Sequence, residues 1–107
     1  MQFKELRMKV EGIGFEKVRS NTDDFFEAFL PVDKLPDLIS VLETLLGPPA
    51  IPNSKGVSPP VQQIAEEYGG IWAGQTFYYQ AQENRSLFAM LWPWADKEHI
   101  TLKLGQK

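Results

Sequence analysis

The sequence contains no cysteine among its 107 residues. Disulfide bonds, thiolate nucleophiles, iron–sulfur clusters and most structural zinc sites all require cysteine, so the sequence excludes them. It also has a single histidine, His99, which excludes any metal site or proton relay built on two histidines. We therefore expect no cofactor and no bound metal.

Basic residues are too few for a nucleic-acid-binding face. The chain has 11 Lys and Arg residues against 14 Asp and Glu residues, and its net charge is −3. No window of the sequence is strongly basic. Proteins that bind nucleic acid normally present a basic face to the phosphates, so we expect no nucleic-acid partner.

Long apolar runs are also missing. The longest run, Leu87 to Ala95, is interrupted by Pro93 and is far shorter than the roughly 20 residues that a membrane-spanning helix needs. Residues 1–11 mix charged and apolar side chains and lack the apolar segment of a secretory signal. The sequence therefore predicts a cytoplasmic protein without a membrane partner.

No group of residues matches a catalytic motif. Gly12-Ile-Gly14 is followed by Lys17 where a dinucleotide-binding fingerprint needs a third glycine. His99 falls on the polar face of an expected strand, with no serine or cysteine nucleophile in an evident motif, so we interpret it as a surface residue. Three small acidic clusters are interpreted as solvated surface: Asp23, Asp24 and Glu27; Glu66 and Glu67; Asp96 and Glu98. We therefore expect a protein that is not an enzyme.

The N-terminal segment supports two readings. In residues 5–11 charged and apolar side chains alternate, and this period of two predicts a half-buried strand. A helix is the alternative, because four apolar side chains recur at spacings of three and four: Phe3, Leu6, Val10 and Ile13. We favour the strand, since Met8 would face away from that helical stripe.

Two helices are expected in the middle of the chain. Residues 33–46 carry one apolar stripe at helical spacing, formed by Leu35, Leu38, Ile39, Leu42, Leu45 and Leu46. Asp33 is placed to cap the first turn and Gly47 to end the helix. Residues 59–68 predict a second helix, which Gly69-Gly70 ends.

A proline-rich loop at residues 47–60 joins these helices and holds five of the chain's eight prolines. Loops of this length are uncommon in small domains and tend to be functional or mobile. Lys55 is the only charged residue of the loop, and we count it among the candidate contacts for a partner or ligand.

The remaining segments predict a sheet. Short strands are expected at residues 15–19, 25–30, 71–82, 87–92 and 99–104, the last three joined by hairpin turns. We therefore predict a single α+β domain over residues 1–107. Its mainly antiparallel, curved sheet of about five strands has two helices on one face, in the order ββ-αα-βββ.

Aromatic residues concentrate between positions 68 and 94, and they make both faces of the middle of this sheet apolar. Two short helices can cover only one face of a five-stranded sheet, and a large uncovered apolar patch is unusual for a monomer. The candidate contact residues for a partner or ligand are Trp72, Tyr78, Phe88, Met90, Trp92 and Trp94, together with Lys55.

The leading functional hypothesis is a non-enzymatic interaction module that forms a homodimer through this aromatic sheet face, because a two-fold axis makes one patch self-complementary. The alternative is a small-molecule binding domain, in which the loop 47–60 closes an aromatic pocket over a small apolar or aromatic ligand. An enzyme that uses buried carboxylates is a third hypothesis.

Overall fold

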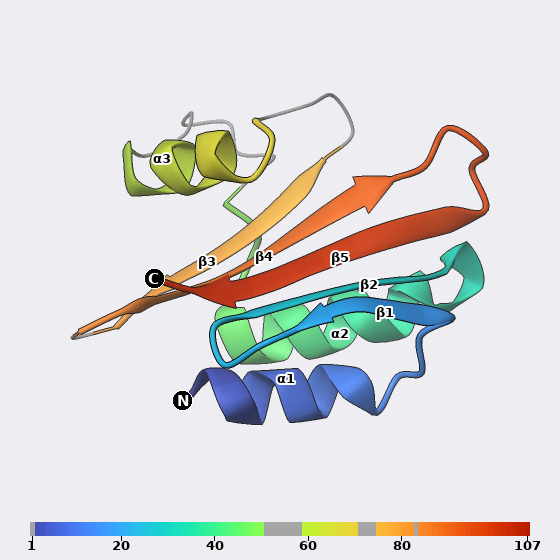
Figure 1. The fold of residues 1–107 in the computed structure, drawn as a ribbon, viewed down its shortest axis with the longest axis horizontal. Helices are drawn as coiled ribbons and strands as arrows, with labels where there is room; N and C mark the ends of the chain where they lie inside the picture. Colours follow the sequence, from blue (N-terminus) through green and yellow to red (C-terminus); the bar gives the residue numbers. More distant parts are fainter. Residues whose placement is uncertain (1, 51–58, 71–74, 83) are drawn as a thin grey trace.

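The structure is a computed structural model that describes residues 2–50, 59–70, 75–82 and 84–107. A five-stranded antiparallel sheet lies at its centre, with helices on both faces (Figure 1). The described elements begin with α1 (Phe3–Glu11), which precedes two strands, two helices and three strands. The α+β class, the antiparallel sheet of five strands and the run ββ-αα-βββ are thus confirmed. Lys55 and Trp72 lie outside the described residues.

The strands follow the order β1-β2-β5-β4-β3 across the sheet, which places β5 in the middle. Their bounds are Lys17–Asn21 for β1, Phe25–Pro31 for β2, Thr76–Ala81 for β3, Ser86–Pro93 for β4 and His99–Gln106 for β5. The pairing of β2 with β5 joins segments far apart in the sequence, for example Ala28 opposite Leu102. Side chains alternate between the two faces, as the strand geometry requires.

The N-terminal strand that the alternation predicted is wrong, because these residues form α1. The helix buries Phe3, Leu6 and Val10, while Met8 is 62% exposed. Met8 faces away from the apolar stripe of the helix, which was the reason for favouring a strand. One exposed apolar side chain is common on protein surfaces, so the burial of three others decides in favour of the helix.

The second helix, α2 (Leu35–Leu46), confirms the predicted stripe and buries Leu38, Leu42 and Leu46. Its start differs from the prediction. Residues Val32–Lys34 form a 3₁₀ turn before it, and no side chain caps the helix, so the predicted cap by Asp33 is wrong. Gly47 ends the helix at φ +85°, a conformation that favours glycine.

Two helices do lie on one face of the sheet, and they are α1 and α2 (Figure 1). The first core fills the space between this helix pair and the sheet. It combines helix residues with alternate residues of four strands: Leu6, Val10, Leu38 and Leu42 with Phe26, Ala28, Tyr78, Leu87, Leu102 and Leu104. No helix in the described ranges is long and apolar enough to cross a membrane.

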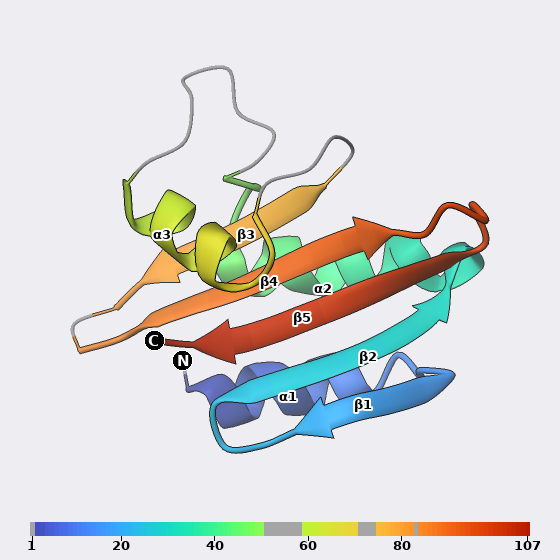
Figure 2. The same cartoon turned by 45° about the horizontal axis from the view of Figure 1, so that its top comes forward.

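The third helix, α3 (Pro59–Glu67), packs on the opposite face, over the β3–β4 half of the sheet (Figures 1 and 2). It forms a second core from Val61, Ile64 and Ala65 with Phe77, Phe88 and Met90. The sequence had placed this helix beside α2. Because it lies on the other face, it covers part of the aromatic surface that we expected a partner to cover.

A close approach of backbone and ring fixes one end of this second core. Gly105 of β5 lies against the ring of Phe88, and a Cβ atom at position 105 would stand 2.5 Å from Phe88 Cζ. The neighbouring ring of Tyr68 contacts Phe88 with ring centroids 5.1 Å apart, and stacks on Phe25 of β2 at 5.2 Å. The aromatic packing therefore extends from α3 across to the start of β2.

Candidate interaction surface

The structure divides the predicted contact residues into buried and accessible ones. Tyr78, Phe88 and Met90 are at most 1% exposed, and they lie within the two cores. Trp92 and Trp94 are half-buried and keep part of their surface accessible. Of the candidates that the structure describes, only these two tryptophans can meet a partner without opening the fold.

The accessible part of the sheet lies on the β1–β2–β5 half of the face that carries α3. No helix of the described chain stands over this half (Figure 2). We call it the open half-face and define it by Arg19, Glu27, Phe29, Trp94 and His99. Register explains how strands bring these residues together, because Lys17 lies opposite Phe29 and Pro31 opposite His99.

Aromatic rings and one guanidinium group organise the open half-face. The ring centroids of Phe29 and Trp94 are 4.9 Å apart, and the Arg19 guanidinium lies 5.0 Å from the Phe29 centroid and 5.7 Å from that of Trp94. The indole Nε1 of Trp94 donates a hydrogen bond to Thr101 Oγ1 at 2.8 Å. This bond fixes the indole against β5, so the ring is held at the surface in one orientation.

Arg19 also lies near an acid, since its Nη1 is 4.0 Å from an oxygen of Glu27. The side chain of Arg19 is 46% exposed, so this ion pair contributes little to stability. The open half-face therefore combines aromatic area with charges of both signs.

His99 closes the end of the open half-face. Its ring centroid is 4.7 Å from that of Trp94 and 5.9 Å from that of Phe29. Its Nδ1 lies 2.7 Å from Asp96 Oδ2, and its Nε2 lies 3.3 Å from Glu16 Oε1. The sequence-based interpretation as an ordinary surface histidine missed these contacts.

The hydrogen bond to Asp96 is the main cause that raises the pKa of His99 above its usual value, and the charge of Glu16 adds to it. The pKa of Asp96 is lowered, first by the hydrogen bond from the backbone N–H of Glu98 and then by the hydrogen bond to His99.

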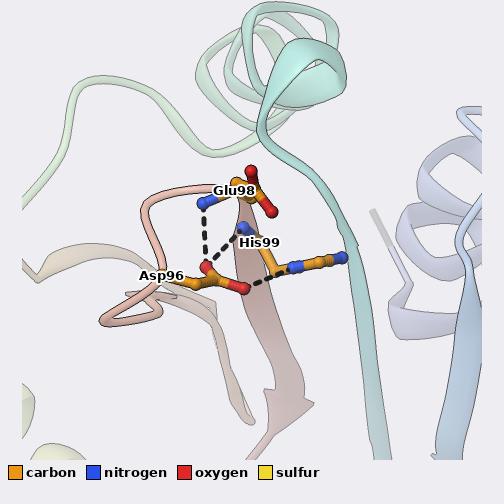
Figure 3. A group of neighbouring side chains, drawn as sticks. All are labelled: Asp96, Glu98 and His99. Atoms are coloured by element: carbon orange, nitrogen blue, oxygen red, sulfur yellow. Dashed lines mark hydrogen bonds and ion pairs between the residues drawn. The ribbon is translucent and has the colours of Figure 1, made fainter.

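The turn before β5 brings side chains with metal-ligating chemistry together. Among the described residues, Asp96, Glu98 and His99 place one oxygen or nitrogen each within 4.8 Å of one another (Figure 3). Asp96 is already engaged, because Oδ1 accepts the backbone N–H groups of Glu98 and His99, and Oδ2 lies against the imidazole (Figure 3). These are the contacts of a carboxylate that stabilises a turn, and we assign no metal site.

Two of the hollows on the described surface lie away from the open half-face. The larger one, about 390 Å³, is polar and lined by Asp24, Asn84, Arg85, Gln106 and Lys107. The second, about 200 Å³, is lined by Lys9, Ser40, Val41, Thr44 and Leu45, from α1 and α2. Neither contains one of the candidate tryptophans, so neither supports the predicted aromatic ligand pocket.

Sequence reasoning missed Arg19, Phe29 and Glu16 as members of this region. The signal for Phe29 was present, because alternation in residues 25–30 places Phe25, Glu27 and Phe29 on one face. The same alternation could not predict the position of Arg19. The register of β1 against β2 shifts between Val18 and Ser20, and a shift of this kind changes which face a side chain joins.

Comparisons with family models, curated proteins and solved structures found no match for the chain. The function is therefore inferred from the geometry of the chain itself.

Proposed function

We propose that this chain is a non-enzymatic interaction module that forms a homodimer through the open half-face. The observation that carries the proposal is the pair of half-buried rings, Phe29 and Trp94, on the half of the sheet that no described helix covers. Aromatic side chains held in one orientation beside an arginine are the composition typical of interface centres.

A second copy of the chain is favoured as the partner because the surface carries both signs of charge. Lys17 and Arg19 lie along β1, whereas Glu27 lies on β2 and Glu16 just before β1. A two-fold axis brings the same patch against itself, so the basic groups of one copy can meet the acidic groups of the other. A patch of one sign would instead repel its own copy.

The size of the patch predicts a weak dimer. Three strands at about 4.8 Å and seven residues at about 3.4 Å give a footprint of about 350 Å². A stable interface buries about 800 Å² on each partner. Contacts at the rim of the patch must add buried area, and we expect a dissociation constant in the micromolar range or above. The interface predicted from the sequence included Phe88, Met90, Trp92 and Trp94. The proposed interface keeps Trp94, adds Phe29 and leaves out Phe88 and Met90, which are buried.

Sedimentation velocity over a range of micromolar concentrations tests the proposal. The wild type is expected to move from the 12.2 kDa monomer towards a dimer as concentration rises. Arg19→Ala removes a cation and its ring contacts and should weaken association about tenfold, corresponding to about 1.4 kcal/mol. Arg85→Ala, at an exposed arginine in the turn before β4, is the matched control and should leave association unchanged.

A second variant tests the aromatic part of the surface. Trp94→Glu places a charge in the centre of the expected interface and should abolish the dimer, because an unpaired buried charge costs several kcal/mol. Far-UV circular dichroism establishes whether this variant is folded. A wild type that remains a monomer throughout, or equal association of the wild type and Arg19→Ala, would contradict the proposal.

A further inference from the structure

The ring of His99 lies between two carboxylates that come from distant parts of the chain. Asp96 belongs to the turn between β4 and β5, and Glu16 belongs to the segment that leads from α1 into β1. The distances are 2.7 Å from Nδ1 to Asp96 Oδ2 and 3.3 Å from Nε2 to Glu16 Oε1. Each ring nitrogen thus faces an acceptor, and carboxylates do not donate when ionised.

The chemistry of imidazole makes this arrangement depend on a proton. A neutral imidazole carries one N–H and one lone pair, whereas an imidazolium carries two N–H groups. Both carboxylates can accept a hydrogen bond from the ring only when His99 is protonated. Once the proton leaves, one ring nitrogen presents its lone pair to a carboxylate oxygen, and that contact becomes repulsive.

The Glu16 contact is the one that deprotonation removes. The Asp96 contact is shorter, and Asp96 is fixed by two further hydrogen bonds from the backbone N–H groups of Glu98 and His99. The Glu16 side chain is 45% exposed and contacts the ring at the longer distance. The neutral ring therefore keeps its single N–H for Asp96 and releases Glu16.

We propose that His99 is a proton-operated tether, which holds the Glu16 side chain to the β4–β5 turn when protonated and releases that side chain when neutral. The backbone N–H of Glu16 donates a hydrogen bond to Phe29 O in either state. The tether goes beyond the proposed homodimer and does not depend on it, since all of its members belong to one chain. Its expected range lies around neutral pH, where histidine is the side chain that ordinarily changes charge.

Charged groups on the surrounding elements influence the balance between the protonated and neutral forms of His99. They are Glu16, Lys17 and Arg19 before and on β1; Asp33 and Lys34 in the 3₁₀ turn; and Asp96, Lys97 and Glu98 in the turn before β5. β2 places the uncharged Pro31 opposite His99 and carries one acid on the same face, Glu27, which lies opposite Lys103 of β5. Of these groups, the two carboxylates at the ring, Asp96 and Glu16, favour the protonated form of His99. The guanidinium of Arg19 lies over the rings of Phe29 and Trp94.

The sign of the pH effect follows from the pKa of His99, which is raised in the folded state. A group of this kind contributes stability below its unfolded pKa of about 6.5, and the contribution is lost as pH rises through the folded pKa. Asp96, whose pKa is lowered, contributes in the opposite direction and loses its effect when pH falls through its folded pKa. The tether is therefore strongest in mildly acidic solution.

NMR titration of the single histidine tests the tether directly, at a concentration at which sedimentation shows a monomer. We expect the His99 pKa to lie above about 6.5 and the backbone amide of Glu16 to titrate with the same midpoint. Glu16→Gln should lower the His99 pKa, because it removes the negative charge beside Nε2. Glu5→Gln makes the same change in charge on α1, away from the ring, and should leave the pKa unchanged.

Denaturant unfolding supplies a second measurement. The wild-type midpoint should be higher at about pH 6 than at about pH 8.5, and this difference should shrink in Glu16→Gln but not in Glu5→Gln. Equal His99 pKa values in the wild type and Glu16→Gln, or an equal pH effect on their midpoints, would overturn the tether. Neither result bears on the dimer, which sedimentation tests separately.

Discussion

Gly105 shows how one missing side chain shapes the second core. Its Cα lies so close to the ring of Phe88 that a Cβ would meet Cζ at 2.5 Å and Cε1 at 2.8 Å. Phe88 is completely buried beneath α3 and cannot move into solvent. We predict that Gly105→Ala destabilises the protein by about 1–3 kcal/mol, the usual cost of overpacking a core.

Denaturant midpoints of Gly105→Ala and of a control measure this effect. Gly12 lies just after α1 at φ −64°, where an alanine is allowed, and the nearest atom to its Cβ would be 3.5 Å away. Gly12→Ala should therefore be neutral or slightly stabilising. If the two substitutions had the same effect, the close contact between Gly105 and Phe88 would be excluded.

Ionisation of the buried Tyr78 is expected to lower the stability of the protein at high pH. Its hydroxyl donates a hydrogen bond to Glu43 Oε2 at 3.1 Å, and burial together with this carboxylate raises the pKa of Tyr78 to about 12. Because the folded pKa exceeds the unfolded value of about 10, stability should fall as pH rises from about 10 towards 12. Tyr78→Phe should lose this part of the pH dependence.

Ultraviolet absorbance of tyrosinate, combined with denaturant midpoints at each pH, tests the prediction for Tyr78. A late ionisation step, near the Tyr78 pKa of about 12, should be present in the wild type and absent in Tyr78→Phe. Tyr79→Phe is the matched control, because the Tyr79 hydroxyl contacts the neutral Ser86 hydroxyl rather than a carboxylate. If Tyr79→Phe also lost the late step, the assignment of that step to Tyr78 would be contradicted.

At the scale of elements, α1 separates two side chains that a strand would place together. Leu6 is completely buried and Met8 is 62% exposed, whereas in a strand both would face the same side. Leu6→Ala should destabilise the protein by about 2–5 kcal/mol, and Met8→Ala should change stability by no more than about 0.5 kcal/mol. Denaturant unfolding of the two variants tests this difference, and similar large losses would support the strand.

The sequence carried enough information for the helix and strand types wherever one period was unambiguous. The leucine stripe of α2 and the alternation of β5 each predicted the correct element. Residues 5–11 satisfied both periods, and the pattern alone could not weigh an exposed Met8 against three buried neighbours. Tertiary burial made that choice.

The candidate site was predicted less well, because it depends on how elements that are distant in the sequence pack together. Nothing in residues 59–68 says which face of the sheet α3 will cover, so Phe88 and Met90 were expected at a surface and are buried. The contact between His99 and Glu16 joins residues from separate elements. Such a contact depends on the β2–β5 pairing, which local sequence patterns do not reveal.

At the scale of the whole molecule, the sheet couples the two cores. Successive residues of β4 alternate between them, with Leu87 and Leu91 in the core under α1 and α2, and Phe88 and Met90 in the core under α3. Neither core can open without disturbing the strand that the other needs. We therefore predict one cooperative unfolding transition.

Two variants test this coupling, one in each core. Leu42→Ala and Ile64→Ala should each destabilise by about 2–5 kcal/mol. In both variants, far-UV circular dichroism and tryptophan fluorescence should give the same midpoint. If the fluorescence midpoint of Ile64→Ala moved to a lower denaturant concentration while its dichroism midpoint stayed at the wild-type value, α3 would instead unfold independently of the sheet.

The position of β4 inside the sheet, between β5 and β3, also determines how the chain can aggregate. Residues 87–92 are apolar and uncharged, a composition that favours cross-β pairing between chains. In the folded protein both edges of β4 are paired, with β3 and β5. Of the two edge strands, β1 carries Lys17 and Arg19 and an irregular register. The other, β3, already accepts a hydrogen bond at Phe77 O from the backbone N–H of Ala50. Both features discourage strand addition. Fibril formation should therefore require global unfolding, so that across a series of variants its rate follows the unfolded population rather than the charge of the native surface.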